Sequence, residues 1–373
     1  MFNLRRENTS IIAKWWRNVD KQILFLFTFL FLLGLFFSFA STSYVVAEKM
    51  NKETYFFFKK HLFFVLASLI LIIIISLLDK EKLIKLLTIS FFASVLLLAL
   101  VPIIGIEVKG SKRWLDLPFL PRFQPVELIK PFYIVILSSL LNHQKYNLYF
   151  KYLLTLFLII PIILLLISQP DIGQSILIIL TWLALIFVSG INLIIFFSLF
   201  GIFIILLSYL IFFVEKFNYI KIRISSFFDS SSNNNFQSEK ASEAIIDGGF
   251  FGKGIGEGTL NSRIPEAHTD YIVSVISEEF GIIIIFLIMI SFILFAYNIF
   301  KKIKDTNENS FKMILIGLIS LIMIQVFVHI GVNLRVLPTT GMTLPYLSYG
   351  GSSIISISII SGIILNLTKR RVY

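Results

Sequence analysis

Long apolar runs are the feature that most constrains how this chain can fold. A helix needs ~20 consecutive apolar residues to cross the hydrocarbon core of a bilayer, and the sequence meets this requirement repeatedly. Backbone groups inside lipid must be satisfied within the segment, so these runs are expected to be helices rather than open strands. We therefore predict an all-α polytopic membrane protein with about ten transmembrane helices, at residues 22–44, 58–78, 86–106, 126–142, 151–168, 172–189, 191–214, 271–299, 313–334 and 346–367.

Positive charge accompanies the ends of these runs. The formal charge of +11 does not indicate a nucleic-acid partner, because Lys and Arg cluster beside the apolar runs, where they contact membrane lipids. Once the long loop at 215–270 is set aside, the loops on the N-terminal side of the membrane are the richer in Lys and Arg. Such loops stay in the cytoplasm. We therefore expect both termini to be cytoplasmic, with the first run retained as a membrane anchor.

This topology divides the chain into five parts. They are a basic cytoplasmic N-terminus (1–21), seven spans (22–214), a large extracytoplasmic loop (215–270), three spans (271–367) and a basic cytoplasmic tail (368–373). Within the large loop, residues 228–240 are too poor in apolar side chains to pack by themselves, and we expect them to be mobile. The chain has no cysteine, so disulfides and thiol chemistry play no part in it.

Two charged residues occur in the fourth apolar run. Glu127 and Lys130 are three positions apart, which places them on one face of a helix within reach of an ion pair. Charges are costly inside a membrane and often mark functional sites there. An internal salt bridge and a substrate-binding role are both compatible with this pair.

A basic cluster with a tryptophan lies in the loop before that run. Lys112, Arg113 and Trp114 suit an interfacial anchor, in which the cations and the indole ring lie at the level of the lipid head groups. The same residues suit a pocket for a phosphate-bearing, lipid-linked ligand, because Lys and Arg are the usual partners of phosphate groups. The residues alone leave both interpretations open.

An acidic residue stands where the eighth span begins. Asp270 is suited to cap a helix, since carboxylates are favoured at a helix N-terminus. It is also suited to act as a general base at the water boundary, because Ser274, Ser277 and Glu278 continue a polar stripe along one flank of the helix. For Glu278, the alternative is a buried, hydrogen-bonded carboxyl that holds helices together.

The segment from Asn333 to Ser353 combines two prolines, three glycines and many hydroxyl groups. Such a segment at membrane depth indicates a broken helix or re-entrant turn, which is tolerated only where it is buried in protein or lines a cavity. Close helix packing through small residues explains Gly350–Ser353 equally well. The sequence contains no recognisable metal cluster or nucleotide-binding fingerprint.

Taken together, these segments resemble the SEDS family of polytopic membrane proteins. The resemblance covers nearly the whole chain, and the occurrence of several motifs in the same order makes it specific. The motifs are Lys109-Gly-Ser-Lys-Arg-Trp114, Gln124-Pro-Val-Glu-Leu-Ile-Lys-Pro131, Gln169-Pro-Asp-Ile-Gly173, Pro265-Glu-Ala-His-Thr-Asp270, Glu278-Glu-Phe-Gly281 and Leu344-Pro-Tyr-Leu-Ser-Tyr-Gly-Gly-Ser-Ser353.

The resemblance implies a peptidoglycan glycosyltransferase that polymerises lipid II on the outer face of the cytoplasmic (inner) membrane. It implies that Asp270 is the catalytic residue and that undecaprenyl pyrophosphate is the leaving group. Lys112, Arg113 or a divalent cation (Mg or Mn) would stabilise that group; no other cofactor and no metal ligands are expected. Substrate-binding roles are expected for Lys112, Arg113, Trp114, Glu127, Lys130, His268, Ser348 and Ser352, and structural roles for Glu278, Gly281, Pro345, Gly350 and Gly351.

Within the family, the large loop is more similar to the cell-division branch than to the elongation branch. The similarity lies in Phe236–Ala244 and in the glycine-rich stretch Gly248–Gly258. It implies location at the division septum, with a class B penicillin-binding protein and other division proteins as partners. The chain departs from the family pattern after Asp229, where a Ser/Asn run replaces the expected proline.

Three alternatives remain open to test. An elongation-type polymerase would share the chemistry and differ in its site of action. A lipid II flippase would use Glu127, Lys130, Glu278 and Arg335 to line a route across the membrane. A division scaffold would act through its outer loops and would not need the carboxylate of Asp270.

Overall fold

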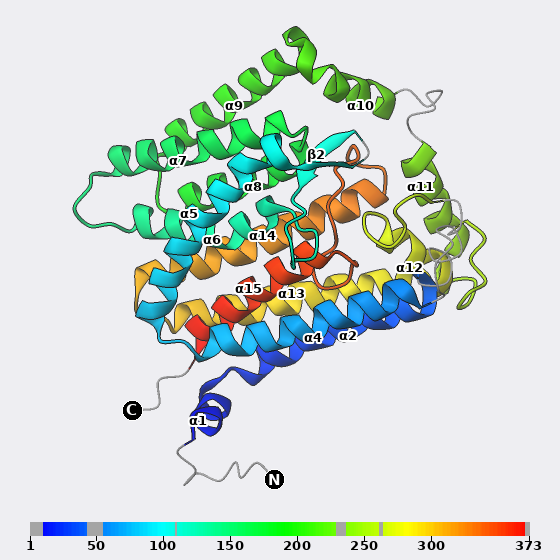
Figure 1. The fold of residues 1–373 in the computed structure, drawn as a ribbon, viewed down its shortest axis with the longest axis horizontal. Coiled ribbons are helices and arrows are strands. Elements are labelled where there is room, and N and C mark those ends of the chain that lie inside the picture. The colour runs from blue at the N-terminus through cyan, green and yellow to red at the C-terminus, as the bar shows by residue number, and fades with distance from the viewer. Residues whose placement is uncertain (1–9, 43–54, 109, 229–235, 261–263, 370–373) are drawn as a thin grey trace.

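The computed structural model describes residues 10–42, 55–108, 110–228, 236–260 and 264–369, which form a bundle of long helices (Figure 1). In this part of the chain, eight helices are long and apolar enough to cross a membrane. The prediction of an all-α polytopic membrane protein is therefore confirmed.

In chain order the elements are α1 (Ile11–Asn18), α2 (Lys21–Phe37), the π-helical turn η1 (Ser38–Thr42), α4 (Phe56–Leu77), α5 (Lys80–Ile104), β1 (Ile106–Val108), β2 (Ser111–Trp114), α6 (Pro125–Leu141), α7 (Leu148–Ser168), α8 (Ile172–Val188), α9 (Leu193–Phe213), η2 (Glu215–Phe217), α10 (Asn218–Phe228), α11 (Phe236–Gly248), α12 (Ile272–Phe280), α13 (Ile282–Lys304), α14 (Asn309–Asn333) and α15 (Gly351–Thr368).

Each of the ten predicted windows coincides with helical structure, but two windows near the C-terminus are corrected. The window at 271–299 was expected to be one helix and is two, α12 and α13. The window at 346–367 contains helix only from Gly351, because the residues before it form an irregular turn. The windows at 126–142 and 172–189 correspond to α6 and α8, which have only 17 residues each and are not among the eight helices long enough to cross a membrane.

The break between α12 and α13 is made by Gly281. Its backbone has φ 84° and ψ 168°, a region that is accessible essentially only to glycine. A Cβ at this position would lie 2.1 Å from the carbonyl oxygen of Phe250. The glycine-rich loop instead caps the new helix, because the N–H of Ile282 donates to the carbonyl of Gly249 at 3.0 Å. Hydrophobic content alone does not reveal such a break.

The core of the bundle is centred on α15, which packs against α2, α4, α6, α13 and α14 (Figure 1). Small residues allow this close approach: a Cβ at Gly362 would lie 2.8 Å from the Cβ of Ile75 on α4. The side chain of Asn366 provides hydrogen bonds to carbonyl groups at the end of α4, because it donates to those of Ile75 and Leu78 at 3.0 and 2.7 Å. At the periphery, α9 is almost wholly exposed, as expected of a helix that faces lipid.

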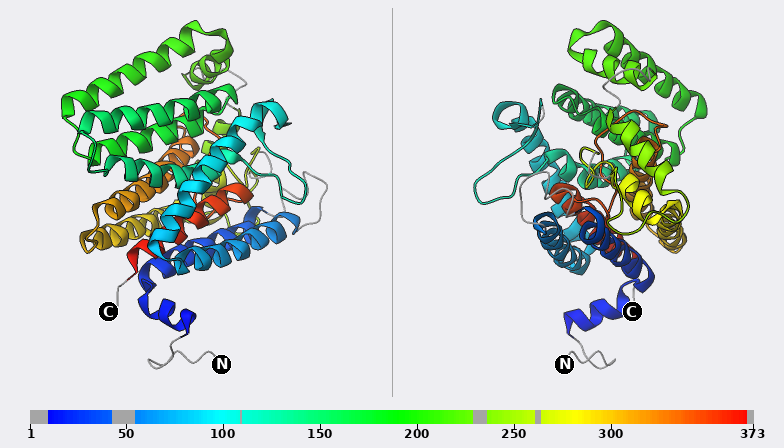
Figure 2. Two further views of the ribbon diagram at one scale, coloured as in Figure 1. Left: turned by 60° about the vertical axis from the view of Figure 1, so that its left-hand side comes forward. Right: turned by 90° about the vertical axis from the view of Figure 1, so that its right-hand side faces the viewer.

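The two ends of the bundle differ in what they carry. At one end, α1 and the C-terminal end of α15 lie together (Figures 1 and 2). The indole of Trp15 donates to Ser76 at 2.7 Å, and Asp20 pairs with Lys302 at 2.8 Å. The described ends of the chain therefore lie on one side, as the topology prediction requires. The other end carries the β-hairpin, α11 and the turn before α15.

The outer segments contain more structure than was predicted. Strands β1 and β2 pair as an antiparallel hairpin in which Glu107 lies opposite Lys112. The run at 228–240 was expected to be mobile; residues 229–235 lie outside the described part, but Phe236–Lys240 begin helix α11. This part of the prediction was wrong because the fully buried Ala241 and Ala244 pack the helix against the bundle.

Candidate active site

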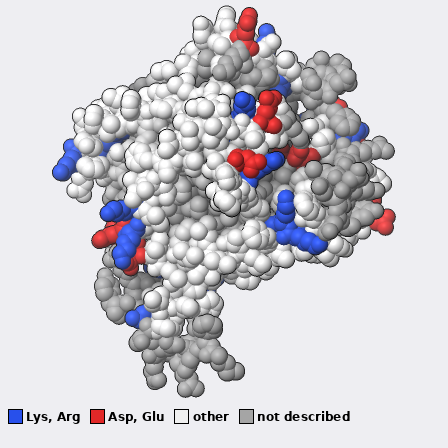
Figure 3. All heavy atoms as spheres, in the orientation of Figure 1, with Lys and Arg blue, Asp and Glu red and all other residues white. Residues whose placement is uncertain are grey.

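A cavity of about 450 Å³ opens at the end of the bundle that carries the hairpin. Its volume falls within the range of small-molecule sites. On the face shown in Figure 3, charged side chains gather towards opposite ends of the molecule, with a broad uncharged surface between them. The ionisable residues that line the cavity are Arg113, Glu127, Asp171, Arg223, Glu266, Asp270 and Tyr271.

Asp270 reaches this cavity from the segment before α12, and its backbone is held from two sides. The carbonyl of Asp270 accepts a hydrogen bond from the side chain of Asn333 at 3.0 Å. The preceding carbonyl, of Thr269, accepts one from Ser348 at 2.7 Å, and that of His268 accepts one from the backbone of Tyr349 at 3.1 Å. Three consecutive carbonyls are thus fixed by α14 and by the turn before α15.

The carboxylate of Asp270 faces the segment 339–343. A Cβ on Gly341 would lie 3.6 Å from Oδ2 of Asp270, and residues Thr339–Thr343 line the same cavity. The N-cap residue of α12 is Tyr271 rather than Asp270, and the side chain of Tyr271 makes no capping hydrogen bond. The carboxylate is half-buried at the wall of the cavity, a position that suits a general base.

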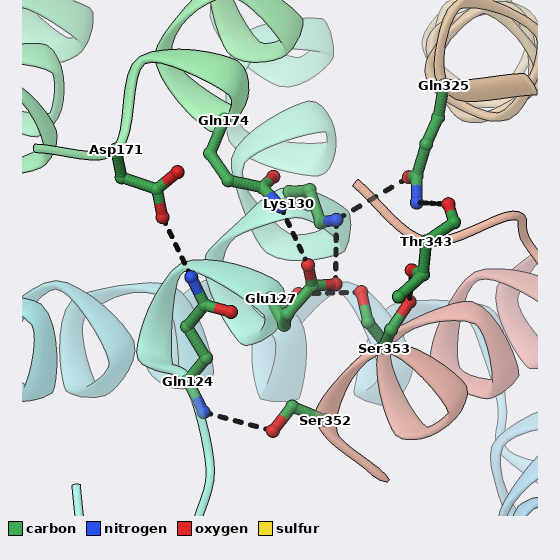
Figure 4. A network of polar contacts seen from close by, with 10 residues as sticks. Gln124, Glu127, Lys130, Asp171, Gln174, Gln325, Thr343, Ser352 and Ser353 are labelled. Carbon is green, nitrogen blue, oxygen red and sulfur yellow. Dashed lines mark hydrogen bonds and ion pairs between the residues drawn. The ribbon is translucent and has the colours of Figure 1, made fainter. Parts of the chain in front are cut away.

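Glu127 and Lys130 form a buried ion pair on α6 (Figure 4). Their charged atoms are 2.7 Å apart. Glu127 also accepts a hydrogen bond from Gln174 at 3.0 Å, while Lys130 lies 3.5 Å from the amide oxygen of Gln325. Only Glu127 of the pair lines the cavity. The internal salt bridge is therefore present, and it leaves one carboxylate at the cavity wall.

Arg113 is tied to the turn between α7 and α8. Its guanidinium donates to the carbonyl of Gln169 at 3.2 Å and to that of Pro170, and it lies 3.8 Å from the carboxylate of Asp171. Gln124 donates to the other oxygen of Asp171 at 2.8 Å (Figure 4). Burial raises the pKa of the Asp171 carboxyl, and the positive charge of Arg113 opposes that shift.

The neighbours of Arg113 on the hairpin have different environments. Trp114 lines the cavity together with Arg113. Lys112 is exposed and does not line the cavity. The substrate-binding role predicted for Lys112 therefore finds no support in the position of its side chain.

The predicted site residues in and just after the turn before α15 likewise include some that line the cavity and some that do not. Ser352 lines the cavity and accepts a hydrogen bond from the backbone of Gln124 at 3.0 Å. Ser348 holds the backbone, because besides its bond to Thr269 it accepts a hydrogen bond from Leu344 at 2.8 Å. Pro345 is buried in the same turn.

The two glycines that follow give α15 room to begin. Gly350 lines the cavity, and a Cβ on it would lie 3.3 Å from the side chain of Thr343. A Cβ on Gly351 would lie 2.6 Å from the ring of Phe64. The close approach of α4 to the start of α15 therefore needs a small residue at position 351.

His268 and Glu278 do not line the cavity. The ring of His268 packs 5.2 Å from that of Phe57 and 5.8 Å from that of Tyr349. Glu278 is fully buried and accepts a hydrogen bond from the backbone of Leu260 at 2.8 Å. That bond joins α12 to the end of the glycine-rich loop.

Several cavity residues were not selected from the sequence. Asp171 belongs to a motif that carried the family resemblance, so a signal for it was present. Gln124 likewise lies in a quoted motif. Arg223, Glu266 and Gln174 have no local pattern that distinguishes them from ordinary polar residues. Only the fold brings α8, α10 and the segment before α12 to one cavity.

The apolar bundle and the charged cavity at its end, with a half-buried carboxylate in its wall, define a polytopic membrane protein with a candidate active site. Residues 21–373 match the family FTSW_RODA_SPOVE, described as "Cell cycle protein". The chain belongs to this family, which confirms the resemblance to SEDS proteins.

Named relatives agree with this membership. A protein of Caulobacter vibrioides named "Probable peptidoglycan glycosyltransferase FtsW" is 31% identical over 367 residues, which are 98% of this chain and 93% of the relative. A protein of Francisella salina with the same name is 36% identical over 283 residues, covering 73% of this chain and 69% of the relative. Both carry the name of the cell-division branch.

Solved structures share the fold. A chain from "Structural coordination of polymerization and crosslinking by a peptidoglycan synthase complex" has a TM-score of 0.78 and 25% identity, covering 94% of this chain and 97% of its own. Thermus thermophilus rod shape determining protein RodA has a TM-score of 0.67 and 25% identity, covering 95% of this chain and 97% of its own.

Proposed function

We propose that the chain is a peptidoglycan glycosyltransferase that polymerises lipid II at the outer face of the cytoplasmic membrane, in the service of septal wall synthesis. The observation that carries the proposal is the position of Asp270 in a charged cavity at the end of the bundle opposite α1 and the end of α15. With cytoplasmic termini, that end faces the outside. Family membership and the names of the relatives supply the substrate class.

In the proposed reaction Asp270 is the general base. Its carboxylate takes the proton from the 4-hydroxyl of the acceptor GlcNAc, and the oxygen attacks the anomeric carbon of the donor chain. The bond from that carbon to the pyrophosphate oxygen breaks, and undecaprenyl pyrophosphate leaves with inversion at the carbon. The backbone bonds from Asn333 and Ser348 hold the base in place, and such positioning supplies much of the effect of a general base.

A divalent cation bound to the pyrophosphate is a further part of the proposal. In the described residues, no group of three or more His, Asp or Glu side chains is arranged to hold a metal ion. Mg²⁺ is commonly held by one or two carboxylates together with substrate phosphates, so the protein need not supply a complete cage. The steps above use only side chains of this chain.

Polymerisation by purified protein tests the proposal. Full-length protein should convert fluorescent lipid II into long glycan chains, and Asp270→Asn should reduce the rate by about 10²–10⁴-fold, the usual contribution of a general base. Assays with and without the class B penicillin-binding protein, and with and without EDTA, would test partner and cation dependence. A folded Asp270→Asn protein that polymerises at the normal rate would exclude the mechanism.

The partner belongs to the proposal as well. One solved chain with this fold comes from a peptidoglycan synthase complex in which polymerisation and crosslinking are coordinated. A crosslinking class B penicillin-binding protein is therefore the expected partner, together with other division proteins. Depletion of this chain should stop septation while cells continue to elongate. Loss of cell shape with normal septation would favour the elongation-type alternative.

The flippase alternative finds less support in the geometry. Of the four charged residues suggested for its route, only Glu127 lines the cavity. Glu278 is bound to Leu260, and Arg335 pairs with Glu239 of α11 at 3.1 Å. Vesicles with labelled lipid II distinguish the activities, since transport moves label between leaflets without forming polymer. The scaffold alternative predicts that cells whose only copy of this protein carries Asp270→Asn still divide.

A further inference from the structure

The two arginines that line the cavity have different partners. Arg113 is engaged by two carbonyls and by the carboxylate of Asp171. Lys130, which does not line the cavity, is paired with Glu127. Asp171 and Glu127, two of the carboxylates that line the cavity, are therefore already paired with Arg113 and Lys130. A cation in such an ion pair is poorly suited to bind an anionic ligand, because its carboxylate partner would then lose its counter-charge.

Arg223 is the cavity-lining cation without such a partner in the described part of the chain. It lies on α10, in the large outer loop, and its side chain is exposed at the cavity. Its one hydrogen bond there is to the carbonyl of Thr339, at 3.5 Å. This leaves most of the donors of its guanidinium available to a ligand.

The placement of Arg223 relates it to Asp270. Its hydrogen-bond partner Thr339 begins the segment 339–343, and Gly341 of the same segment lies against the carboxylate of Asp270. Arg223 and Asp270 therefore both lie beside one short segment at the cavity wall. A substrate bound against this segment can contact the base and the cation at once.

We infer that Arg223 binds the pyrophosphate of the lipid-linked donor, whereas Arg113 orders the turn at 169–171. The inference rests on the proposed function and differs from the expectation that Lys112 or Arg113 contacts the leaving group. When the bond from the anomeric carbon to the pyrophosphate oxygen breaks, the electron pair remains on the pyrophosphate. A guanidinium matches phosphate oxygens with two parallel donors and stabilises this charge as it develops.

The test compares Arg223→Gln with Lys221→Gln in the full-length chain together with its partner. Lys221 is exposed on the same helix and does not line the cavity, so its replacement controls for net charge. We expect Arg223→Gln to lower the polymerisation rate by about 10²-fold, the lower end of the effect of removing one preorganised donor. Lys221→Gln should behave as the natural sequence does, and Arg223→Lys should recover part of the rate.

A binding measurement separates this role from a structural one. Undecaprenyl pyrophosphate and undecaprenyl phosphate are titrated into the Asp270→Asn protein, with and without Arg223→Gln. We expect Arg223→Gln to weaken binding of the pyrophosphate by about tenfold or more, the loss of one charge-assisted contact, and to change binding of the monophosphate less. Equal pyrophosphate affinity with and without Arg223 would overturn the inference, whatever the rate.

The binding measurement does not depend on catalysis. If the natural sequence fails to polymerise lipid II, the proposed function fails, and the titration still decides whether Arg223 recognises the pyrophosphate. Thermal unfolding of each variant in detergent shows whether the fold is retained. If Arg223→Gln unfolds at a much lower temperature and binds both lipids equally poorly, Arg223 is a structural residue and the inference is wrong.

Discussion

The buried pair of Glu127 and Lys130 illustrates how one motif can hold the fold and serve the site. Both side chains are removed from solvent, and Gln174 and Gln325 contact their charged groups (Figure 4). Breaking a buried pair leaves one charge uncompensated, which is far more costly than replacing both partners with neutral residues.

Variants of this pair separate its two possible roles. Lys130→Met should destabilise the protein by about 3–5 kcal/mol because the carboxylate of Glu127 loses its counter-ion. The double variant Glu127→Gln/Lys130→Met should recover most of this loss, measured as the unfolding temperature in detergent. If the double variant is stable and polymerises normally, the pair is structural. If it is stable and inactive, Glu127 also serves the substrate.

Arg113 and Lys112 show why residue type alone is not enough at this scale. Both are cations in one loop motif, and from the sequence alone both are predicted to bind phosphate. In the structure, the side chain of Lys112 is exposed, whereas the guanidinium of Arg113 donates hydrogen bonds to carbonyls of the turn at 169–171. The cation left for a ligand, Arg223, comes from a different element.

At the scale of elements, the break between α12 and α13 is the feature that positions the segment carrying Asp270. The carbonyls of Glu278 and Glu279 accept hydrogen bonds from Lys253 and Gly254, at 2.9 and 3.0 Å. The glycine-rich loop is thereby fastened to the end of α12. An unbroken helix would leave no room for this loop, since Phe250 occupies the space beside Gly281.

Gly281→Ala tests the importance of the break. The substitution places a side chain in a backbone region that costs about 1–3 kcal/mol for any residue other than glycine, and it adds a collision with the carbonyl of Phe250. We expect a clear fall in unfolding temperature and in polymerisation. Gly201→Ala is the control, because that position on α9 has open space around it. Equal effects of the two substitutions would show that the break is not required.

At the scale of the whole molecule, the important property is its orientation in the membrane. The orientation determines whether the cavity opens to the outside of the cell, where lipid II would be polymerised. The structure places the two described ends of the chain together, and the cavity at the opposite end. The assignment of these ends to cytoplasm and exterior rests on the distribution of Lys and Arg.

The absence of cysteine makes this orientation directly measurable, since a single introduced thiol is labelled without background. Glu257 in the glycine-rich loop and Asn307 between α13 and α14 are both exposed. We expect Glu257→Cys to react with a membrane-impermeant maleimide in cells whose outer envelope has been made permeable. Asn307→Cys should react only after the cytoplasmic membrane is opened. The reverse pattern would invert the topology and place the cavity inside the cell.

The sequence by itself determined the class of protein and the approximate positions of its long apolar helices, because crossing hydrocarbon imposes a length and an apolar character that can be read locally. It also marked Asp270 and the pair of Glu127 and Lys130, since polar residues stand out against an apolar background. These properties belong to single segments and do not depend on how the helices are packed.

Only the tertiary structure decided which polar groups meet. The break at Gly281 depends on the glycine-rich loop, which lies earlier in the chain, and the engagement of Arg113 depends on a turn 56 residues further along. Hydrogen bonds and ion pairs act over a few ångströms, and side-chain direction sets which of them form. Which of the two cavity arginines is engaged by backbone carbonyls and which keeps donors for a ligand is therefore a property of the packed bundle.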